Sequence, residues 1–125
     1  MSATTTGFIV FAHGSSVESA NEAVRRVAAD FASQLGNPQV VAAFLEGGKP
    51  DLDGAVDSLA TSGATEIRVL PYFLTLGMHL QRDLPKLVHA AAARHPGVHI
   101  RVAPPLDGHP RLTDILLERA TEVAG

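Results

Sequence analysis

The sequence predicts an α/β domain in three layers, with a mainly parallel four-stranded sheet between helices on both of its faces. Short apolar runs recur along the chain, as in parallel strands that are buried on both faces. The segments between them carry an apolar residue every three or four positions, which is typical of amphipathic helices. Right-handed crossovers then place helices on both faces. A chain of 125 residues has room for one such domain, residues 1–125.

The first strand is expected over residues 7–12, an apolar run that stops at His13. We expect Ser16 to cap the helix that follows, with Ser19 as the alternative cap, and Gly36 to end that helix. The apolar stripe predicted for this helix consists of Ala20, Val24, Val27, Ala28, Phe31 and Leu35.

The second strand is expected over residues 40–45, and the helix after it begins near Pro50 and ends at Gly63. Its predicted inward face consists of Leu52, Ala55, Val56 and Leu59. The third strand is expected over residues 67–74. Pro71 cannot donate a hydrogen bond to a sheet, so it indicates a bulge or the end of that strand.

A third helix is expected over about residues 84–95, and a fourth strand over residues 98–103. In that strand His99 and Arg101 alternate with apolar residues, which indicates a half-exposed strand at the edge of the sheet. The last helix is expected over residues 109–123. Its predicted apolar residues are Leu112, Ile115, Leu116 and Ala120.

The composition excludes several classes of protein. The chain has no cysteine, so disulfides, thiolate metal sites, iron–sulfur clusters and cysteine nucleophiles are excluded. Its 10 basic and 13 acidic residues form no basic stripe, so we expect no nucleic-acid partner. No segment approaches the ~20 apolar residues that cross a bilayer, and residues 1–6 lack the basic region of a signal peptide. We therefore expect no membrane association and a cytoplasmic location.

Polar residues follow three successive predicted strands: His13, Glu46 and His79, the last in a loop beyond Gly77. The carboxyl ends of parallel strands lie on one edge of a sheet, so these side chains can converge. Two imidazoles and a carboxylate suit Co²⁺, Ni²⁺, Fe²⁺ or Zn²⁺, and without thiolates such a site is labile. A lone histidine at a strand end is often only a hydrogen-bonded loop residue, but three such residues favour a site.

Other residues near these strand ends have two interpretations. Apolar side chains there either belong to the core or form the walls of a broad cleft for a flat ligand. These side chains are Phe11, Phe44, Tyr72, Phe73, Leu76 and Met78. The remaining histidines, which we interpret as structural or solvated, are His89, His95, His99 and His109.

Three motifs resemble those of one known family. They are Phe11-Ala12-His13-Gly14-Ser15, then Ala43-Phe44-Leu45-Glu46, then Pro71-Tyr72-Phe73-Leu74 with Gly77-x-His79-x-x-x-Asp83-Leu84-Pro85. From its first strand to about Pro105, the chain resembles the short form of the sirohydrochlorin chelatases, the CbiX/SirB-like class II chelatases. The resemblance implies a single chelatase-like lobe.

The resemblance also implies an activity and a site. The activity is that of a lyase that inserts Co²⁺ or Fe²⁺, with Ni²⁺ as a further alternative, into the tetrapyrrole sirohydrochlorin. The product leads to cobalamin or siroheme, and no nucleotide or other cofactor is required. His13 and His79 resemble the metal-binding and catalytic histidines of the family, and Glu46 resembles its assisting carboxylate. Short members pair, so we expect a symmetric homodimer.

The chain departs from the family at Ser16, where an arginine is frequent, and at Gly47-Gly48, which leaves substrate binding and metal preference open. Cations are expected to bind the carboxylates of the substrate, and the candidates are Lys49, Arg82, Lys86 and Arg101. A non-catalytic carrier of metal or tetrapyrrole is the alternative function. A phosphatase of the histidine type ranks last, because Ala12 stands where that class needs an arginine.

Overall fold

The computed structural model describes residues 5–75 and 77–124, and for His79 the backbone alone. Four strands and four helices alternate along the chain. They are β1 (Thr6–Ala12), α1 (Glu18–Leu35), β2 (Val40–Phe44), α2 (Leu52–Thr61), β3 (Glu66–Pro71), α3 (Met78–Arg94), β4 (His99–Val102) and α4 (Arg111–Glu122). All strand pairs are parallel, in the order β2-β1-β3-β4, which confirms the predicted fold class.

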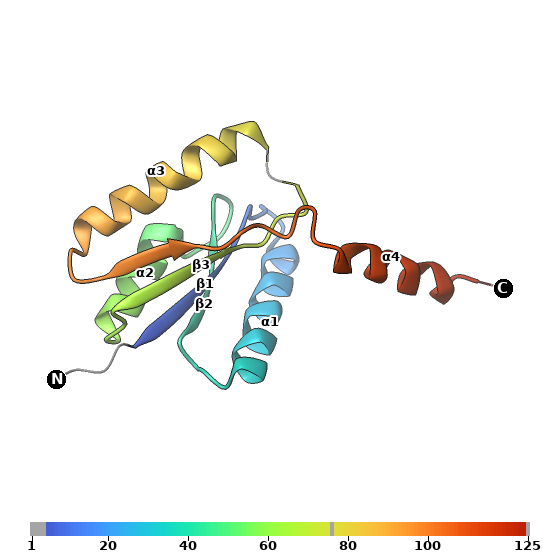
Figure 1. Cartoon of the computed structure of the whole chain (residues 1–125), viewed down its shortest axis with the longest axis horizontal. Helices are drawn as coiled ribbons and strands as arrows, with labels where there is room; N and C mark the ends of the chain where they lie inside the picture. The colour runs from blue at the N-terminus through green and yellow to red at the C-terminus, as the bar shows by residue number, and fades with distance from the viewer. Residues whose placement is uncertain (1–4, 76, 125) are drawn as a thin grey trace.

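The sheet lies between α1 on one face and α2 and α3 on the other (Figure 1). The side chains of β1 alternate between the two faces, so that Ile9 and Phe11 belong to the core on the α2 and α3 side. Val10 and Ala12 belong to the smaller core beneath α1. Because β1 is central and its last six residues are buried, the predicted apolar run is explained by burial on both faces.

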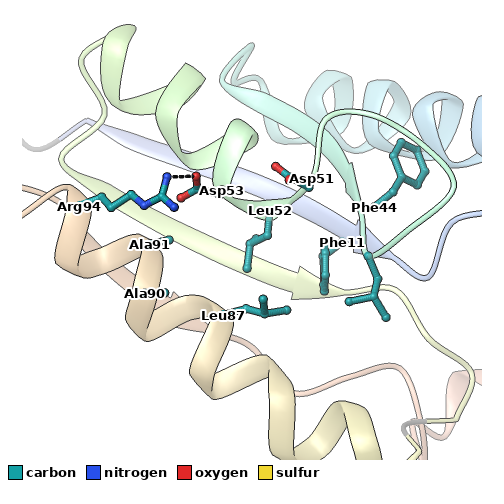
Figure 2. Close-up of a pocket in the computed structure, with 10 residues that line it drawn as sticks. Phe11, Phe44, Asp51, Leu52, Asp53, Leu87, Ala90, Ala91 and Arg94 are labelled. Atoms are coloured by element: carbon teal, nitrogen blue, oxygen red, sulfur yellow. Dashed lines mark hydrogen bonds and ion pairs between the residues drawn. The ribbon is translucent and has the colours of Figure 1, made fainter.

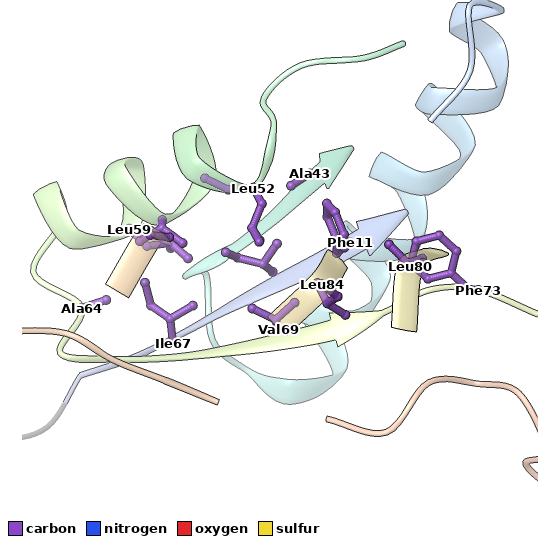
Figure 3. Close-up of a cluster of buried hydrophobic side chains, with 14 residues drawn as sticks. Phe11, Ala43, Leu52, Leu59, Ala64, Ile67, Val69, Phe73, Leu80 and Leu84 are labelled. Carbon is purple, nitrogen blue, oxygen red and sulfur yellow. The ribbon is translucent and has the colours of Figure 1, made fainter. Parts of the chain in front are cut away.

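The larger core holds the carboxyl ends of β1 and β3 in place (Figure 3). Phe11 and Phe73 pack edge to face with ring centroids 6.0 Å apart. Leu80 and Leu84 of α3 belong to the same cluster, and the inward face predicted for α2 is buried. Each of the larger side chains contributes roughly 1.5–3 kcal/mol through its burial. The strand ends that carry the candidate site residues therefore rest on a packed base.

The structure corrects the start of α1. Val17, rather than Ser16 or Ser19, is the N-cap, and the helix begins at Glu18. The predicted stripe is also shifted, because Ala20 is exposed and Asn21 is buried in its place. A helix that starts at Glu18 turns position 21 toward the sheet, since residues 21, 24, 28 and 31 follow the helical period.

The structure also moves the start of the third helix. It begins at Met78, not near residue 84, so the backbone of His79 lies in a first helical turn rather than in a loop. Leu80 and Leu84 are one turn apart and both buried, and this packing stabilises the early start. Pro85 lies inside the helix, where it removes one backbone hydrogen bond.

The bounds of β1, β2 and β4 lie within one residue of the predicted ones, whereas β3 ends three residues before the predicted end at residue 74. β3 ends at Pro71, as one of the two interpretations of that proline requires. β4 is an edge strand in which His99 and Arg101 are exposed, which confirms the prediction from their alternation with apolar residues.

The last helix forms as expected but does not cover the sheet. α4 projects away from the rest of the domain (Figure 1). All of its residues are described, and none is buried. Ile115, Leu116 and Leu117 are at least half exposed. Within the described residues, no helix has the length and apolar character needed to span a membrane.

Candidate functional site

His13 follows the last residue of β1 and projects into solvent, with 61% of its side chain exposed. Its Nδ1 lies 3.3 Å from the carbonyl oxygen of Gly14. In the neutral tautomer that carries its proton on Nδ1, the ring donates to this carbonyl, and the lone pair of Nε2 is available to a metal or a proton.

Glu46 follows β2, and its side chain, 70% exposed, reaches toward His13. The distance from His13 Nε2 to Glu46 Oε1 is 3.7 Å. The backbone supports this approach, because Ala12 pairs with Phe44 and the N–H of Glu46 donates to the carbonyl of His13 at 3.0 Å. The structure thus brings together two of the three predicted site residues, at the predicted edge of the sheet.

Two glycines allow the loops after β1 and β2 to touch. Gly14 has φ +89°, and a Cβ atom on it would lie 1.7 Å from the carbonyl oxygen of Glu46. Gly47 has φ +73°, and a Cβ atom on it would lie 2.7 Å from the carbonyl carbon of Ser15. A side chain at either position would force the loops apart, so the approach of His13 and Glu46 depends on the absence of one.

The third predicted residue is only partly described. The backbone of His79 lies in the first turn of α3, shortly after β3, and β3 neighbours β1. The side chain of His79 lies outside the described part of the chain, so its place relative to His13 and Glu46 stays a prediction. Among the described side chains, no group of three acidic or histidine residues could hold a metal ion. The side chain of His79 is not one of these described side chains.

A groove beside Glu46 contains several charges. It is lined by Glu18, Arg25, residues 45–49 and Asp51. Arg25 bonds to Glu18 and lies 5.3 Å from the centre of the Phe44 ring. This hydrogen bond holds the pKa of Glu18 below its usual range, so the pair stays ionised at neutral pH.

The predicted substrate-binding cations fall in different places. Lys49 lines the groove beside Glu46 and is exposed. Lys86 is exposed on α3. Arg82 Nε lies 3.7 Å from Oδ1 of the adjacent Asp83. Arg101 reaches toward Glu66, the first residue of β3, with 3.9 Å between Nε and Oε1. Arg101 is therefore directed away from the carboxyl edge, whereas Lys49 is next to it.

A separate cavity of about 210 Å³ lies between α2 and α3 (Figure 2). Phe11 and Phe44 line it, although both are fully buried, and Arg94 and Asp53 form an ion pair at its side. Of the apolar side chains predicted to be core or cleft wall, these two and Phe73 are core. Tyr72 and Met78 are exposed, and Leu76 lies outside the described residues.

The other histidines fit a structural or solvated role. His89 and His99 are exposed. His95 caps the end of α3 with its Nε2 3.8 Å from Asp57, and His109 accepts a hydrogen bond from the N–H of Arg111 at 3.1 Å.

Asn21 bonds to both loops of the candidate site but is not among the residues predicted from the sequence. The available signal was a polar residue where the helical period from Val24, Ala28 and Phe31 requires an apolar one.

The parallel four-stranded sheet, with His13 and Glu46 3.7 Å apart where β1 and β2 end, defines an α/β fold with a histidine–carboxylate site at the carboxyl edge of the sheet. In the comparison with protein families, the model of the CbiX family matches residues 7–123. The chain belongs to the CbiX family.

Individual relatives show how much of the chain is shared. A sirohydrochlorin cobaltochelatase of Methanococcoides burtonii is 28% identical, and the match covers 94% of this chain and 95% of the relative. The chloroplastic sirohydrochlorin ferrochelatase of Arabidopsis thaliana is 30% identical over 113 residues, covering 90% of this chain and 50% of the plant protein. A solved CbiX protein of Marinobacter aquaeolei VT8 is 30% identical, with a TM-score of 0.83 over 94% of this chain and 96% of that one. The chain thus matches two relatives over nearly their full length and the plant protein over half.

Proposed function

We propose that this protein is a sirohydrochlorin chelatase that inserts Co²⁺ or Fe²⁺ into the tetrapyrrole without a nucleotide or other cofactor. The observation that carries the proposal is the 3.7 Å approach of His13 Nε2 to Glu46 Oε1 at the carboxyl edge of the sheet. Membership of the CbiX family and the names of the cobaltochelatase and ferrochelatase relatives support this substrate and these metals.

The reaction makes two demands that this site meets. The incoming metal must exchange water for the ring nitrogens, and two pyrrole N–H groups must lose their protons. The free lone pair on Nε2 lets His13 hold the metal, together with His79. Glu46, beside His13 and open to solvent, accepts the pyrrole protons and passes them to water. Lys49 binds a substrate carboxylate at the same edge.

The test is the initial rate of Co²⁺ insertion into sirohydrochlorin, followed through the visible absorbance of the tetrapyrrole, with and without protein. His13→Ala and Glu46→Gln should each lower the enzyme-dependent rate by about 100-fold, the typical contribution of one positioned acid–base group. His99→Ala is the matched control, since His99 is an exposed histidine that pairs in register with the first residue of β3. Wild-type rates in both site variants would refute the assignment.

The same assay separates the enzyme from a carrier. A carrier would bind the tetrapyrrole, with the absorbance change of binding, but would leave the insertion rate equal to that of the mixture without protein. Repeating the assay with Fe²⁺ and Ni²⁺ gives the order of metal preference, which the histidine–carboxylate set does not fix.

We further propose that the chain works as a homodimer. The support is α4, whose exposed Ile115 and Leu116 lie on one face while Asp114, Glu118 and Glu122 follow each other four residues apart. A second copy offers a matching surface: an apolar groove of about 330 Å³ beside α1, lined in part by Val10, Val27, Phe31 and Leu70. Arg68 lies close by, over the ring of Phe8, and can attract the acidic side of the helix.

The dimer is tested by sedimentation of the wild type and of Leu116→Asp, which places a charge on the apolar face of α4. Thr121→Asp is the control for added charge, because Thr121 is exposed and lies on the opposite side of α4 from Ile115 and Leu116. The proposal requires a dimer for the wild type and Thr121→Asp and a monomer for Leu116→Asp. A monomeric wild type would contradict it. A cytoplasmic location is part of the same proposal and is tested by cell fractionation.

A further inference from the structure

Asn21 is an unusual residue for its position. Its side chain is 1% exposed, and it is the one polar side chain buried in the part of the chain that the structure describes. It lies in the first turn of α1, on the side that faces the sheet. A buried amide costs free energy unless each of its polar atoms is hydrogen-bonded. The bonds that Asn21 makes therefore explain its presence.

Three of the Asn21 hydrogen bonds go to the two loops of the candidate site, and a fourth goes from Nδ2 to Glu18 Oε2 at 3.3 Å. Asn21 Oδ1 accepts from the N–H of Ser15 at 2.9 Å, and Nδ2 donates to the carbonyl of Ser15 at 2.9 Å. The same Nδ2 donates to the carbonyl of Gly47 at 3.0 Å. A backbone N–H only donates and a carbonyl only accepts, so these partners fix the orientation of the amide. One side chain thus binds the loop after β1 and the loop after β2.

The surroundings leave little freedom. A Cβ atom on Gly48 would lie 2.9 Å from Asn21 Nδ2 and 3.0 Å from the ring of Phe44. The amide is therefore enclosed by the loops that it joins. An aspartate in its place would accept from Ser15 but would set a carboxylate against two carbonyl oxygens. An alanine would leave the polar groups of both loops without these partners.

We propose that Asn21 is a positioning residue for the reaction: it holds the loops after β1 and β2 together, and so keeps His13 within reach of Glu46. The proposal rests on the proposed function, because it assigns Asn21 a role through those two groups. Asn21 does not contact the site atoms of either residue. Its loss should therefore lower kcat more than it changes the KM for the tetrapyrrole.

Asn37 provides a matched control. It is also an asparagine whose side chain bonds to the backbone, donating to the carbonyl of Thr6 at 3.1 Å and accepting from the N–H of Gln39 at 2.9 Å. It lies at the other end of the sheet, where β1 and β2 begin. Because Asn37 is less buried and makes fewer hydrogen bonds, Asn37→Ala should lower the free energy of unfolding less than Asn21→Ala, and it should leave the site in place.

The experiment measures insertion kinetics, urea unfolding and backbone amide exchange for the wild type, Asn21→Ala and Asn37→Ala. We expect Asn21→Ala to lose about tenfold or more in kcat, as small displacements of reacting groups do, with KM for the tetrapyrrole within about twofold. The amide of Glu46, which donates to the carbonyl of His13, should also lose its exchange protection. Asn37→Ala should keep both the kinetics and this protection.

The outcomes separate this proposal from the proposed function. If the wild type does not catalyse insertion, the proposed chelatase function is refuted. The amide exchange of Glu46 in Asn21→Ala then decides alone whether Asn21 joins the loops. If the wild type is active and Asn21→Ala keeps its kcat and its protection at Glu46, the proposal is wrong. Should Asn21→Ala not fold, Asn21→Ser takes its place, because serine is polar but too short to join both loops. If neither variant folds, Asn21 serves the fold and the proposal is overturned.

Discussion

Gly14→Ala tests how closely the activity depends on the contact between the two loops. The new Cβ atom would lie 1.7 Å from the carbonyl oxygen of Glu46, whereas real Cβ contacts are essentially never below 3.0 Å. The loops must separate by at least about 1.3 Å, the difference between these two values. Displacements of about 1 Å can lower a rate about 100-fold. We therefore expect Gly14→Ala to insert metal about 100-fold more slowly than the wild type.

The matched control is Gly36→Ala. Gly36 also has a positive φ, +73°, but a Cβ atom there meets nothing within 4 Å. In both variants the free energy of unfolding falls by about 1–2 kcal/mol, because alanine disfavours the left-handed region. Only Gly14→Ala also has the clash with the carbonyl oxygen of Glu46. The assays are Co²⁺ insertion kinetics and urea unfolding. A Gly14→Ala protein that folds and keeps its rate within about twofold would refute the dependence of activity on this contact.

Three further predictions concern stability and are measured by urea unfolding. Leu84→Ala removes a side chain that is 4% exposed and should cost about 2–5 kcal/mol; a loss below about 1 kcal/mol would contradict its place in the core. Asp51→Ala removes the α2 cap, in which the N–H of Gly54 donates to Asp51 Oδ1 at 2.8 Å, and should cost about 1 kcal/mol, while Asp51→Asn should cost less. The hydrogen bond from Arg68 holds the pKa of Glu66 below its ordinary value of 4.5. The ionised carboxylate therefore stabilises the fold fully above pH 4.5, and this contribution is lost as the pH falls through the lowered pKa. Acidification should thus destabilise the wild type more than Glu66→Gln. Equal slopes of the free energy of unfolding against pH in the two proteins would contradict the pairing of Arg68 with Glu66.

The strand ends show what the sequence could predict. A strand buried on both faces must be a short apolar run, so the ends of β1 and β2 are visible as the positions where such runs stop. Parallel topology then places those ends on one edge. These two facts place His13 and Glu46 on the same edge, and their proximity follows because β1 and β2 are neighbours in the sheet.

Other features depend on contacts that have no local signal. The start of α3 was predicted too late: burial of Leu80 and Leu84 extends the helix back to Met78, with Pro85 inside it. The role of Asn21 depends on the loop after β2, which lies 26 residues away along the chain. The direction of α4 was not predictable either, since an apolar stripe shows that a helix is covered but not by which molecule.

The exposure of the site and the direction of α4 have a common explanation. His13 and Glu46 are 61% and 70% exposed, so water weakens their electrostatic interactions with a metal or a substrate. An enclosed site strengthens such interactions and protects the substrate from water. A second copy, held through α4, can supply that enclosure to a single lobe. The proposed dimer and the proposed activity then stand together: Leu116→Asp, which leaves His13 and Glu46 intact, should lose insertion to the extent that it becomes monomeric, and a fully active monomer would separate the two proposals.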